Sequence, residues 1–566
     1  MDLTYFSGVS VTLIFRQVLC LTCVFISHLA SAENAGRPNI LLLMAEDMSS
    51  RVGVFGDSVA RTPNLDALAA QGVRYANVFT TAGVCAPSRA AHILGMHQIS
   101  TGTQHMRSST HPGGSYYSVP PEGVKAYPEL LRAAGYFTYT DNKLDYQFSS
   151  ALPRSGPSTI WDMEGAAASD WEKRADGQPF FGFINFLVTH ESGVFAPLGS
   201  TPQSATHFVM QLLRWWRLDK AVPKVTSPAD VLVPPYYADT PTVRADLARH
   251  YDNIAYMDGE IGDILRQLEA DGLVDSTIVI WTTDHGDGLP RSKRELYDAG
   301  IKVPMVIRWP EAFRPKGVEP GALDERLISF VDLGPTILSL AGVPVPAYQQ
   351  GRNFASTEGV PREFIYASRD RIDEVLDRQR AVRDQRYKYI RSWYPQQAGG
   401  HALKFRDNID MVREMRALYE AGELNAAQSA WYEAPGEERL FDLEQDLFEL
   451  NDVSSDPQYR GQLQRMREEM DAWLDRVGDW SEESEDDMVV RFEPGGERQV
   501  TPAPTLSISD GRLVITPRAV GHSVEYRQNG GHWQLYSGPV RVTTTDTLQG
   551  RAVRYGWEES EVVSGP

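Results

Sequence analysis

Cysteine is scarce in this chain, with three among 566 residues. Cys20 and Cys23 lie in an N-terminal segment where a basic residue precedes an apolar run, 18–30, that ends in Ala-Ser-Ala. This layout is typical of a cleaved export signal, so we expect removal of residues 1–32 and a secreted or periplasmic protein. The remaining Cys85 excludes a disulfide framework within one chain. It is then a buried inert thiol, an intermolecular link or a reactive group.

Basic charge and further long apolar runs are also lacking. Acidic residues outnumber basic ones by 75 to 55, which gives a net charge of -20. This balance argues against nucleic-acid binding, because neutralising phosphates needs a basic face. A local pocket of Lys, Arg and His can still hold a small anion. After signal cleavage we expect no membrane span, because no second apolar run is long enough.

Three continuous apolar runs, 39–44, 180–188 and 276–282, are typical of strands buried on both faces of a parallel sheet. Residues 250–268 have helical spacing of apolar side chains, and 62–68 has the features of a capped helix start. We therefore expect an α/β fold with a large, mostly parallel central sheet flanked by helices.

Acidic residues and histidines follow all three runs. They are Glu46 and Asp47, His190 and Glu191, and Asp284 and His285. In open α/β sheets the ligand crevice lies beyond the carboxyl ends of the strands, so these groups are expected to converge. Each pair taken alone also fits a helix cap or a turn. Together, oxygen ligands with an imidazole indicate a divalent cation such as Ca²⁺ or Mg²⁺.

The sequence around the last cysteine resembles a known signature. Cys85-x-Pro87-Ser88-Arg89 is similar to the motif of type I sulfatases, in which the cysteine is oxidised to Cα-formylglycine (3-oxoalanine). Further blocks resemble that family in the same order, at 37–40, 62–66, 297–304, 386–389 and 441–443. Several motifs in order are far more specific than one. The resemblance implies an alkaline phosphatase-like fold with a smaller C-terminal α+β subdomain.

The resemblance also implies a chemistry. A hydrated aldehyde attacks the sulfur of a sulfate ester and then releases sulfate, whereas a serine or thiol would stay sulfated. The implied cation is Ca²⁺, with Mg²⁺ as the alternative, held by Glu46, Asp47, Asp284, His285 and the modified Cys85. The family more usually has Asp at the first of these positions and often Asn at the fourth. A formylglycine-generating enzyme or an anaerobic maturase is implied as a partner.

The same resemblance assigns the other site residues. Arg89 is expected to hold the formylglycine hydrate, while Lys143, His190 and Lys293 contact the sulfate oxygens. His190 is the expected proton donor to the leaving oxygen. Asp145 stands where many sulfatases have a histidine. It either accepts the proton of the second step or orients Lys143 or a sugar hydroxyl.

Residues outside this core are expected to select the substrate. His105 and Arg107 either bind a sugar carboxylate or second sulfate, or belong to a surface loop. The sequence around Glu191 is similar to bacterial polysaccharide sulfatases, including those resembling heparan N-sulfatase, which makes it a further substrate contact. The tryptophans of 214–217 are expected in the core rather than as a sugar platform. The charge run 369–374 is typical of a solvated face or a salt-bridged loop.

The chain divides by composition. We expect a catalytic α/β domain at 33–360, the C-terminal subdomain at 361–480 and an acidic, Pro/Gly-rich linker at 481–505. Short alternating stretches in 506–566 predict an antiparallel β-sandwich, similar to the C-terminal module of bacterial chitobiases.

The expected function is that of an exported bacterial sulfatase acting on O-sulfate esters of a sulfated polysaccharide or oligosaccharide. One alternative is an N-sulfoglucosamine sulfohydrolase. Another is a phosphonate or phosphate ester hydrolase that uses the same modified cysteine. A non-catalytic glycan-binding protein is disfavoured, because the nucleophile, the metal acids and both lysines are all present.

Overall fold

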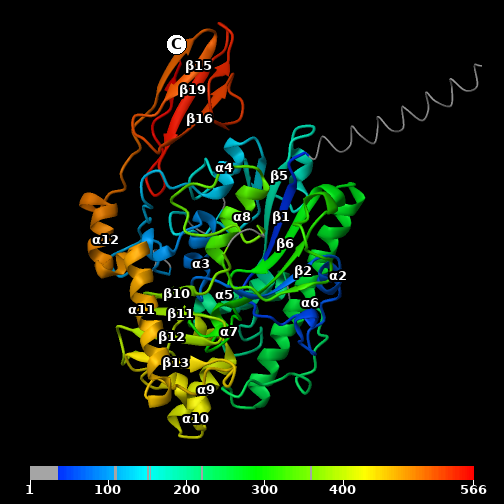
Figure 1. The fold of residues 1–566 in the computed structure, drawn as a ribbon, viewed down its shortest axis with the longest axis vertical. Coiled ribbons are helices and arrows are strands. Elements are labelled where there is room, and N and C mark those ends of the chain that lie inside the picture. Colours follow the sequence, from blue (N-terminus) through cyan, green and yellow to red (C-terminus); the bar gives the residue numbers. More distant parts are fainter. Residues whose placement is uncertain are drawn as a thin grey trace, which may run out of the picture.

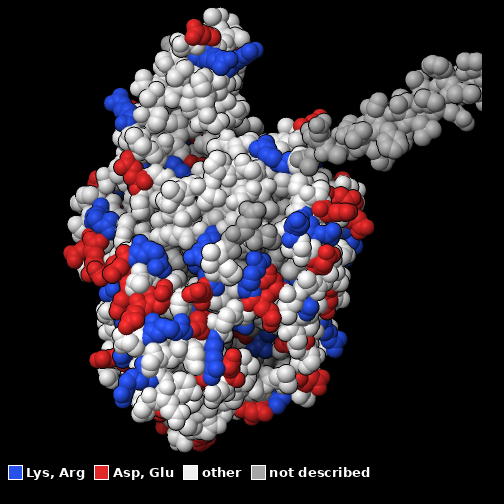
Figure 2. Space-filling model, viewed as in Figure 1, with Lys and Arg blue, Asp and Glu red and all other residues white. Residues whose placement is uncertain are grey.

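The computed structural model describes residues 36–106, 111–149, 152, 154–217, 221–356 and 360–565. The expected export signal and Arg107 lie outside these residues. Within them, no helix is both long and apolar enough to cross a membrane. Acidic and basic side chains are interspersed over the face shown in Figure 2.

A mixed sheet forms the centre of the molecule. Its strands are β1 (Asn39–Ala45), β2 (Val73–Phe79), β3 (Phe137–Thr140), β4 (Met163–Glu164), β5 (Phe180–Phe186), β6 (Thr277–Thr283), β7 (Lys302–Arg308), β8 (Leu323–Asp324) and β9 (Ile328–Ser329). Their order is β4-β3-β5-β1-β6-β7-β2-β8, and β9 also pairs with β2. Strand β7 is antiparallel to both of its neighbours, and the other pairings are parallel. The predicted α/β class with a mostly parallel sheet is confirmed.

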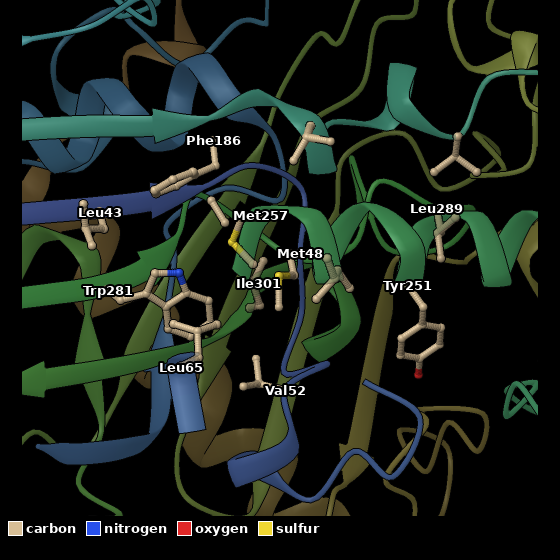
Figure 3. Close-up of a cluster of buried hydrophobic side chains, with 14 of the residues drawn as sticks. Leu43, Met48, Val52, Leu65, Phe186, Tyr251, Met257, Trp281, Leu289 and Ile301 are labelled. Carbon is tan, nitrogen blue, oxygen red and sulfur yellow. The ribbon is translucent and has the colours of Figure 1, made fainter. Parts of the chain in front are cut away.

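Helices cover both faces of this sheet (Figure 1). Side chains alternate along β1, so Leu43 and Leu42 enter two separate hydrophobic clusters. On the first face Leu43 lies near Trp281 and Phe186, with Met257 of the long helix beside them (Figure 3). The covering helices are α2 (Pro63–Gln71) and α6 (Pro241–Ala270) on this face, and α3 (Cys85–Leu94), α4 (Tyr127–Ala133) and α8 (Leu333–Leu340) on the other.

A second, antiparallel sheet follows in the chain. Its strands, in order, are β10 (Ile365–Arg369), β11 (Gln379–Arg383), β12 (Tyr387–Ser392) and β13 (Glu438–Asp442). Helix α11 (Arg460–Val477) covers it, with Met466 and Trp473 packed against Tyr366, Val382 and Tyr389. This arrangement is the smaller α+β part that the resemblance implies.

The stretch predicted as a linker contains a helix, α12 (Glu485–Phe492). The Ser484 side chain accepts a hydrogen bond from the Asp487 backbone N–H, and three acids occupy the first turn, where they favour the positive end of the helix dipole. Met488 and Phe492 pack against Tyr116. The acidic run is thus the start of an amphipathic helix, so the interpretation as a linker is wrong for this part.

Two small antiparallel sheets form the C-terminal module, β14-β15-β18 and β17-β16-β19-β20. The strands are β14 (Thr505–Ser509), β15 (Arg512–Thr516), β16 (Ser523–Gln528), β17 (Gln534–Leu535), β18 (Val540–Arg541), β19 (Leu548–Val553) and β20 (Val563–Ser564). Figure 1 shows the module projecting from the α4 end of the main body. The antiparallel strands predicted for this region are confirmed.

The module is fixed to the main body through Glu129 of α4, which accepts hydrogen bonds from Tyr555 (2.7 Å), Thr159 (2.5 Å) and Ser523. Burial raises the pKa of Glu129, but Lys125 and these hydroxyls outweigh it, so the pKa is lowered and the carboxylate is charged. Two of the three hydroxyls, those of Tyr555 and Ser523, belong to the module, so docking of the module contributes to satisfying this charge.

Replacing Glu129 by alanine leaves three buried hydroxyls without their acceptor. We expect a loss of about 3 kcal/mol in the free energy of unfolding, because a buried hydrogen-bonded charge is removed from its partners. Urea or thermal unfolding measures the loss. Glu269→Ala, which changes an exposed glutamate at the end of α6, is the control and should shift stability by less than about 0.5 kcal/mol. Equal effects of the two substitutions would contradict this assignment.

Candidate active site

The polar residues predicted at three strand ends do converge. Strand β1 lies between β5 and β6 and is parallel to both, so all three carboxyl ends meet at one edge of the sheet. The Asp47 backbone N–H donates to Asp284 Oδ1 (3.0 Å), and the Glu191 backbone N–H donates to Asp47 Oδ2 (2.7 Å). Asp47 thereby joins the ends of all three strands.

Cys85 occupies the first turn of α3, next to this edge. Its side chain is fully buried, with Sγ 3.3 Å from His285 Nε2 and 3.6 Å from Asp47 Oδ1. Ser88, on the same helix, donates to the Asp284 carbonyl at 2.7 Å. A Cβ at Gly83 would lie 2.2 Å from the Glu295 carbonyl oxygen, so a side chain there would push the helix start away. Local packing thus fixes the thiol against the strand ends.

The donors at this point fit a divalent cation. One ligand atom each from Asp47, Cys85, Asp284 and His285 lies within 4.8 Å of the others, and Glu46, Asp47 and His190 form a second such group. The three carboxylates are fully buried. Burial lowers the pKa of His285, but Asp284 and Asp47 raise it well above the usual range. Buried carboxylates need opposite charge, and oxygen ligands suit Ca²⁺ or Mg²⁺.

Three basic side chains predicted for the site surround these carboxylates. Arg89 donates through Nε to Asp284 (3.0 Å) and through Nη2 to Glu46 (3.3 Å). Lys143 Nζ lies 3.1 Å from Glu46, and Lys293 Nζ lies 2.5 Å from Asp47 Oδ2. The guanidinium expected to hold the formylglycine hydrate is thus bound to the metal-site acids.

Glu191 forms ion pairs with Lys293 and with the neighbouring Arg294. Its two carboxylate oxygens accept from Arg294 at 2.9 and 3.0 Å, and Lys293 Nζ lies 3.0 Å from Oε1. On its other side Arg294 contacts Asp373 at 3.2 Å. Glu191 thus holds Lys293 and Arg294 through these contacts, and its expected role as a substrate contact stays a prediction.

His190 and Asp145 lie at the rim of the cluster. His190 Nδ1 is 2.9 Å from Ser192 Oγ, and Nε2 has no hydrogen-bond partner among the described residues. Burial and the Lys293 charge lower the pKa of His190 to about 3. Burial also lowers the pKa of Lys143, but Glu46 and Cys85, with a smaller contribution from Asp145, raise it. Asp145 therefore contributes to the electrostatics of Lys143, and the alternative roles expected for it stay predictions.

The other expected substrate contacts have different outcomes. His105 is buried, with Nδ1 3.7 Å from Glu485 of α12. Arg107 lies outside the described residues. Trp215 and Trp216 on α5 (Ala205–Arg217) are 43% and 67% exposed, so the expectation that they pack in the core is wrong. Residues 369–373 of the charge run are buried, and Arg369 pairs with Glu295 at 2.6 Å, whereas Glu374 is exposed.

Sequence reasoning missed two groups that complete the site. Asn185, within β5, accepts from Arg89 Nη1 (2.6 Å) and donates to Asp141 (2.6 Å). Its only signal was one amide inside an otherwise apolar run. Arg294 follows Lys293 directly, and its role appears only from the carboxylates that the fold places around it.

Comparison with known families agrees with this geometry. A family model described as "Sulfatase" matches residues 38–343, and one described as "N-sulphoglucosamine sulphohydrolase, C-terminal" matches residues 291–430. The first covers more than half of the chain. The protein belongs to the sulfatase family, and it is a sulfuric ester hydrolase.

Individual proteins and solved structures are also similar to this chain. It is 38% identical to an "Ulvan-active sulfatase" of Formosa agariphila over 93% of this chain and 91% of that protein. It is 26% identical to the human N-sulphoglucosamine sulphohydrolase over 77% and 89% of the two chains. A solved 2-O GAG sulfatase superposes with a TM-score of 0.56 at 19% identity, covering 78% of this chain and 93% of that one, which shows a shared fold.

Proposed function

We propose that this protein removes O-sulfate groups from a sulfated polysaccharide or oligosaccharide, using a Cα-formylglycine made from Cys85 and a divalent cation, Ca²⁺ being favoured. The observation that carries the proposal is the position of Cys85, on the first turn of a helix and against Asp47 and His285. The polysaccharide substrate is supported by the ulvan-active relative.

In this proposal Asp47, Asp284 and His285 hold the cation together with residue 85, and Glu46 joins them from the side of Lys143. The cation supplies positive charge beside the reacting sulfate. The hydrated aldehyde supplies a nucleophile that is regenerated at each turnover. Arg89 keeps Asp284 and Glu46 oriented toward the site.

Lys143 and Lys293 would neutralise the sulfate oxygens as charge builds on the leaving oxygen. The N-terminus of α3, where the N-cap residue Val84 makes no side-chain capping hydrogen bond, adds backbone N–H groups and a favourable dipole for the anion. His190 Nε2, which has no partner among the described residues, is the proposed proton donor. Because its pKa is about 3 here, donation requires that the negative charge of the bound substrate raise it.

We further propose export after removal of residues 1–32 and maturation by a formylglycine-generating or anaerobic maturase enzyme. The chain then divides into a catalytic domain at 33–360, a subdomain at 361–480 that α12 extends, and a β-module at 506–566. The N-sulfoglucosamine sulfohydrolase alternative is kept, because the C-terminal family model carries that description.

Three substrates distinguish the candidate functions: an O-sulfated oligosaccharide, N-sulfoglucosamine, and a phosphate monoester of the sugar that carries the O-sulfate. We expect kcat/KM for the O-sulfate to exceed that for each of the other two substrates by at least about tenfold, because the binding groups stabilise the transition state of one ester best. A tenfold preference corresponds to a difference of about 1.4 kcal/mol in activation free energy. Released sulfate, phosphate and amine report turnover. A preference for N-sulfate would support the alternative, and a preference for phosphate would contradict both.

A further inference from the structure

A cleft of about 560 Å³ lies beside the candidate active site and is used by none of the proposed roles. The chain from Asp370 to Arg378 forms one wall, the residues after β12 form another, and the start of α12 closes the third side. The α12 wall lies beyond residue 430, where the second family match ends. This wall therefore belongs to the part of the chain that the family models do not cover.

One short segment separates the cleft from the nucleophile. Ile372 packs in a small cluster with Cys85 and Met106, and the next residue, Asp373, pairs with Arg294. Glu374, which follows, already lines the cleft. A second path runs along the rim: the Lys404 backbone N–H donates to Glu374 (3.3 Å), and the ring of the neighbouring Phe405 lies 6.2 Å from that of His190. A ligand in this cleft is thus a neighbour of one at the reacting centre.

A buried histidine lines the cleft with unsatisfied nitrogens. His105 is 6% exposed, and neither ring nitrogen has a hydrogen-bond partner among the described residues. A buried polar group without a partner is costly, so such groups are normally satisfied by protein, water or ligand. Burial lowers the pKa of His105, which makes the ring neutral, with one donor and one acceptor nitrogen. A sugar hydroxyl, itself donor and acceptor, matches this pair.

Aromatic side chains stand on the wall after β12. Trp393 and Tyr394 are 37% and 39% exposed, an unusual pair for a water-facing position. The Arg378 guanidinium lies 4.4 Å from the Trp393 ring centre and is itself held by Asp479 at 2.9 Å. The tryptophan is therefore fixed in place. Aromatic faces in clefts stack against the C–H surface of ligands such as sugar rings.

Acidic groups dominate the remaining lining, which has six carboxylates against two guanidinium groups. Both guanidinium groups are engaged, Arg371 with Glu485 and Arg378 with Asp479. Three of the other carboxylates are paired with arginines outside the lining, Asp370 with Arg380, Asp377 with Arg369 and Glu483 with Arg491. A neutral His105 adds no positive charge. Because both lining guanidinium groups are already paired with carboxylates, the described lining offers an anionic sugar no arginine to bind, whereas neutral hydroxyls can donate to carboxylates such as Glu374.

We propose that the cleft is a subsite for an uncharged sugar residue of the polysaccharide, adjacent along the same chain to the sulfated residue at the reacting centre. This inference rests on the proposed function and refines it. It replaces the sequence-based expectation that His105 binds a sugar carboxylate or a second sulfate. Trp393 provides the stacking face, while His105 and carboxylates such as Glu374 bind hydroxyls.

Two disaccharides test the subsite, both carrying the same sulfated residue but joined to either a neutral hexose or a uronic acid, with the sulfated monosaccharide as reference. We expect wild-type kcat/KM to be about tenfold higher for the neutral disaccharide than for the acidic one. Trp393→Ala should lower the ratio of disaccharide to monosaccharide kcat/KM about tenfold. Glu374→Gln should narrow the discrimination against the uronic acid. Trp533→Ala, which changes a half-buried tryptophan of the terminal module, is the matched control and should leave these ratios unchanged.

A wild-type preference for the uronic acid would overturn the proposal, and so would equal losses on all three substrates in Trp393→Ala. Failure of the proposed function is distinguishable, because the wild-type protein would then release sulfate from none of the three. In that case calorimetric titration with the desulfated neutral disaccharide decides the subsite alone. Binding that is lost in Trp393→Ala supports it, and no binding to the wild-type protein refutes it.

Discussion

Replacing Cys85 by alanine is expected to lower kcat for sulfate ester hydrolysis by at least about 10⁴-fold, the range seen when a covalent nucleophile is removed. The physical reason is specific to this residue. Its Sγ lies 3.3 Å from His285 and 3.6 Å from Asp47, so anything made from it reacts inside the donor cluster. Alanine keeps the helix start but supplies no group that can be oxidised to an aldehyde.

The mass of the peptide that contains Cys85 tests directly whether this residue is converted to formylglycine. In protein from its native host, the peptide 75–89 should have lost the thiol sulfur and gained an aldehyde oxygen. Thermal unfolding of the Cys85→Ala variant is the control, since one small buried side chain is removed and the fold should persist. An unmodified thiol in fully active protein would sink the formylglycine mechanism.

The convergence of the site was predictable because it follows from strand direction. Three apolar runs that read as parallel strands must present Asp47, His190 and Asp284 at one edge once they are neighbours, and β5-β1-β6 are neighbours. The order of the strands was not in the sequence pattern. It depends on contacts between segments more than a hundred residues apart, as in the pairing of Ile40 with Phe181.

The missed features share a physical cause. The charges at 481–487 read as a solvated linker, yet Glu485 is 8% exposed because Arg371 and Tyr116 meet it. Likewise the sequence could not show that Arg294 would take up both oxygens of Glu191. Charge patterns report composition, whereas the pairing that permits burial is decided by distant parts of the chain.

Asp284→Asn is expected to remove the bound divalent cation and to lower kcat by at least about 10³-fold, comparable to losing a major electrostatic contribution to the transition state. Asp284 Oδ2 also accepts from Arg89 at 3.0 Å, so the substitution weakens an ion pair as well as the donor set. A lower melting temperature alone would therefore not identify metal loss. The diagnostic quantity is how stability depends on Ca²⁺.

A cation that binds only the folded state raises the free energy of unfolding by RT ln(1 + [L]/Kd), about 4 kcal/mol at a thousand times Kd. Wild-type stability should thus rise with Ca²⁺ and fall with a chelator, while Asp284→Asn responds to neither. Asp298→Asn is the matched control: it changes a partly buried aspartate paired with Arg383 and Lys388, outside the donor set. That variant should lose stability yet keep its Ca²⁺ dependence, because its defect is a broken ion pair and not a missing ligand. If Asp284→Asn kept the full Ca²⁺ response, the donor set assigned to Asp47, Asp284 and His285 would be wrong.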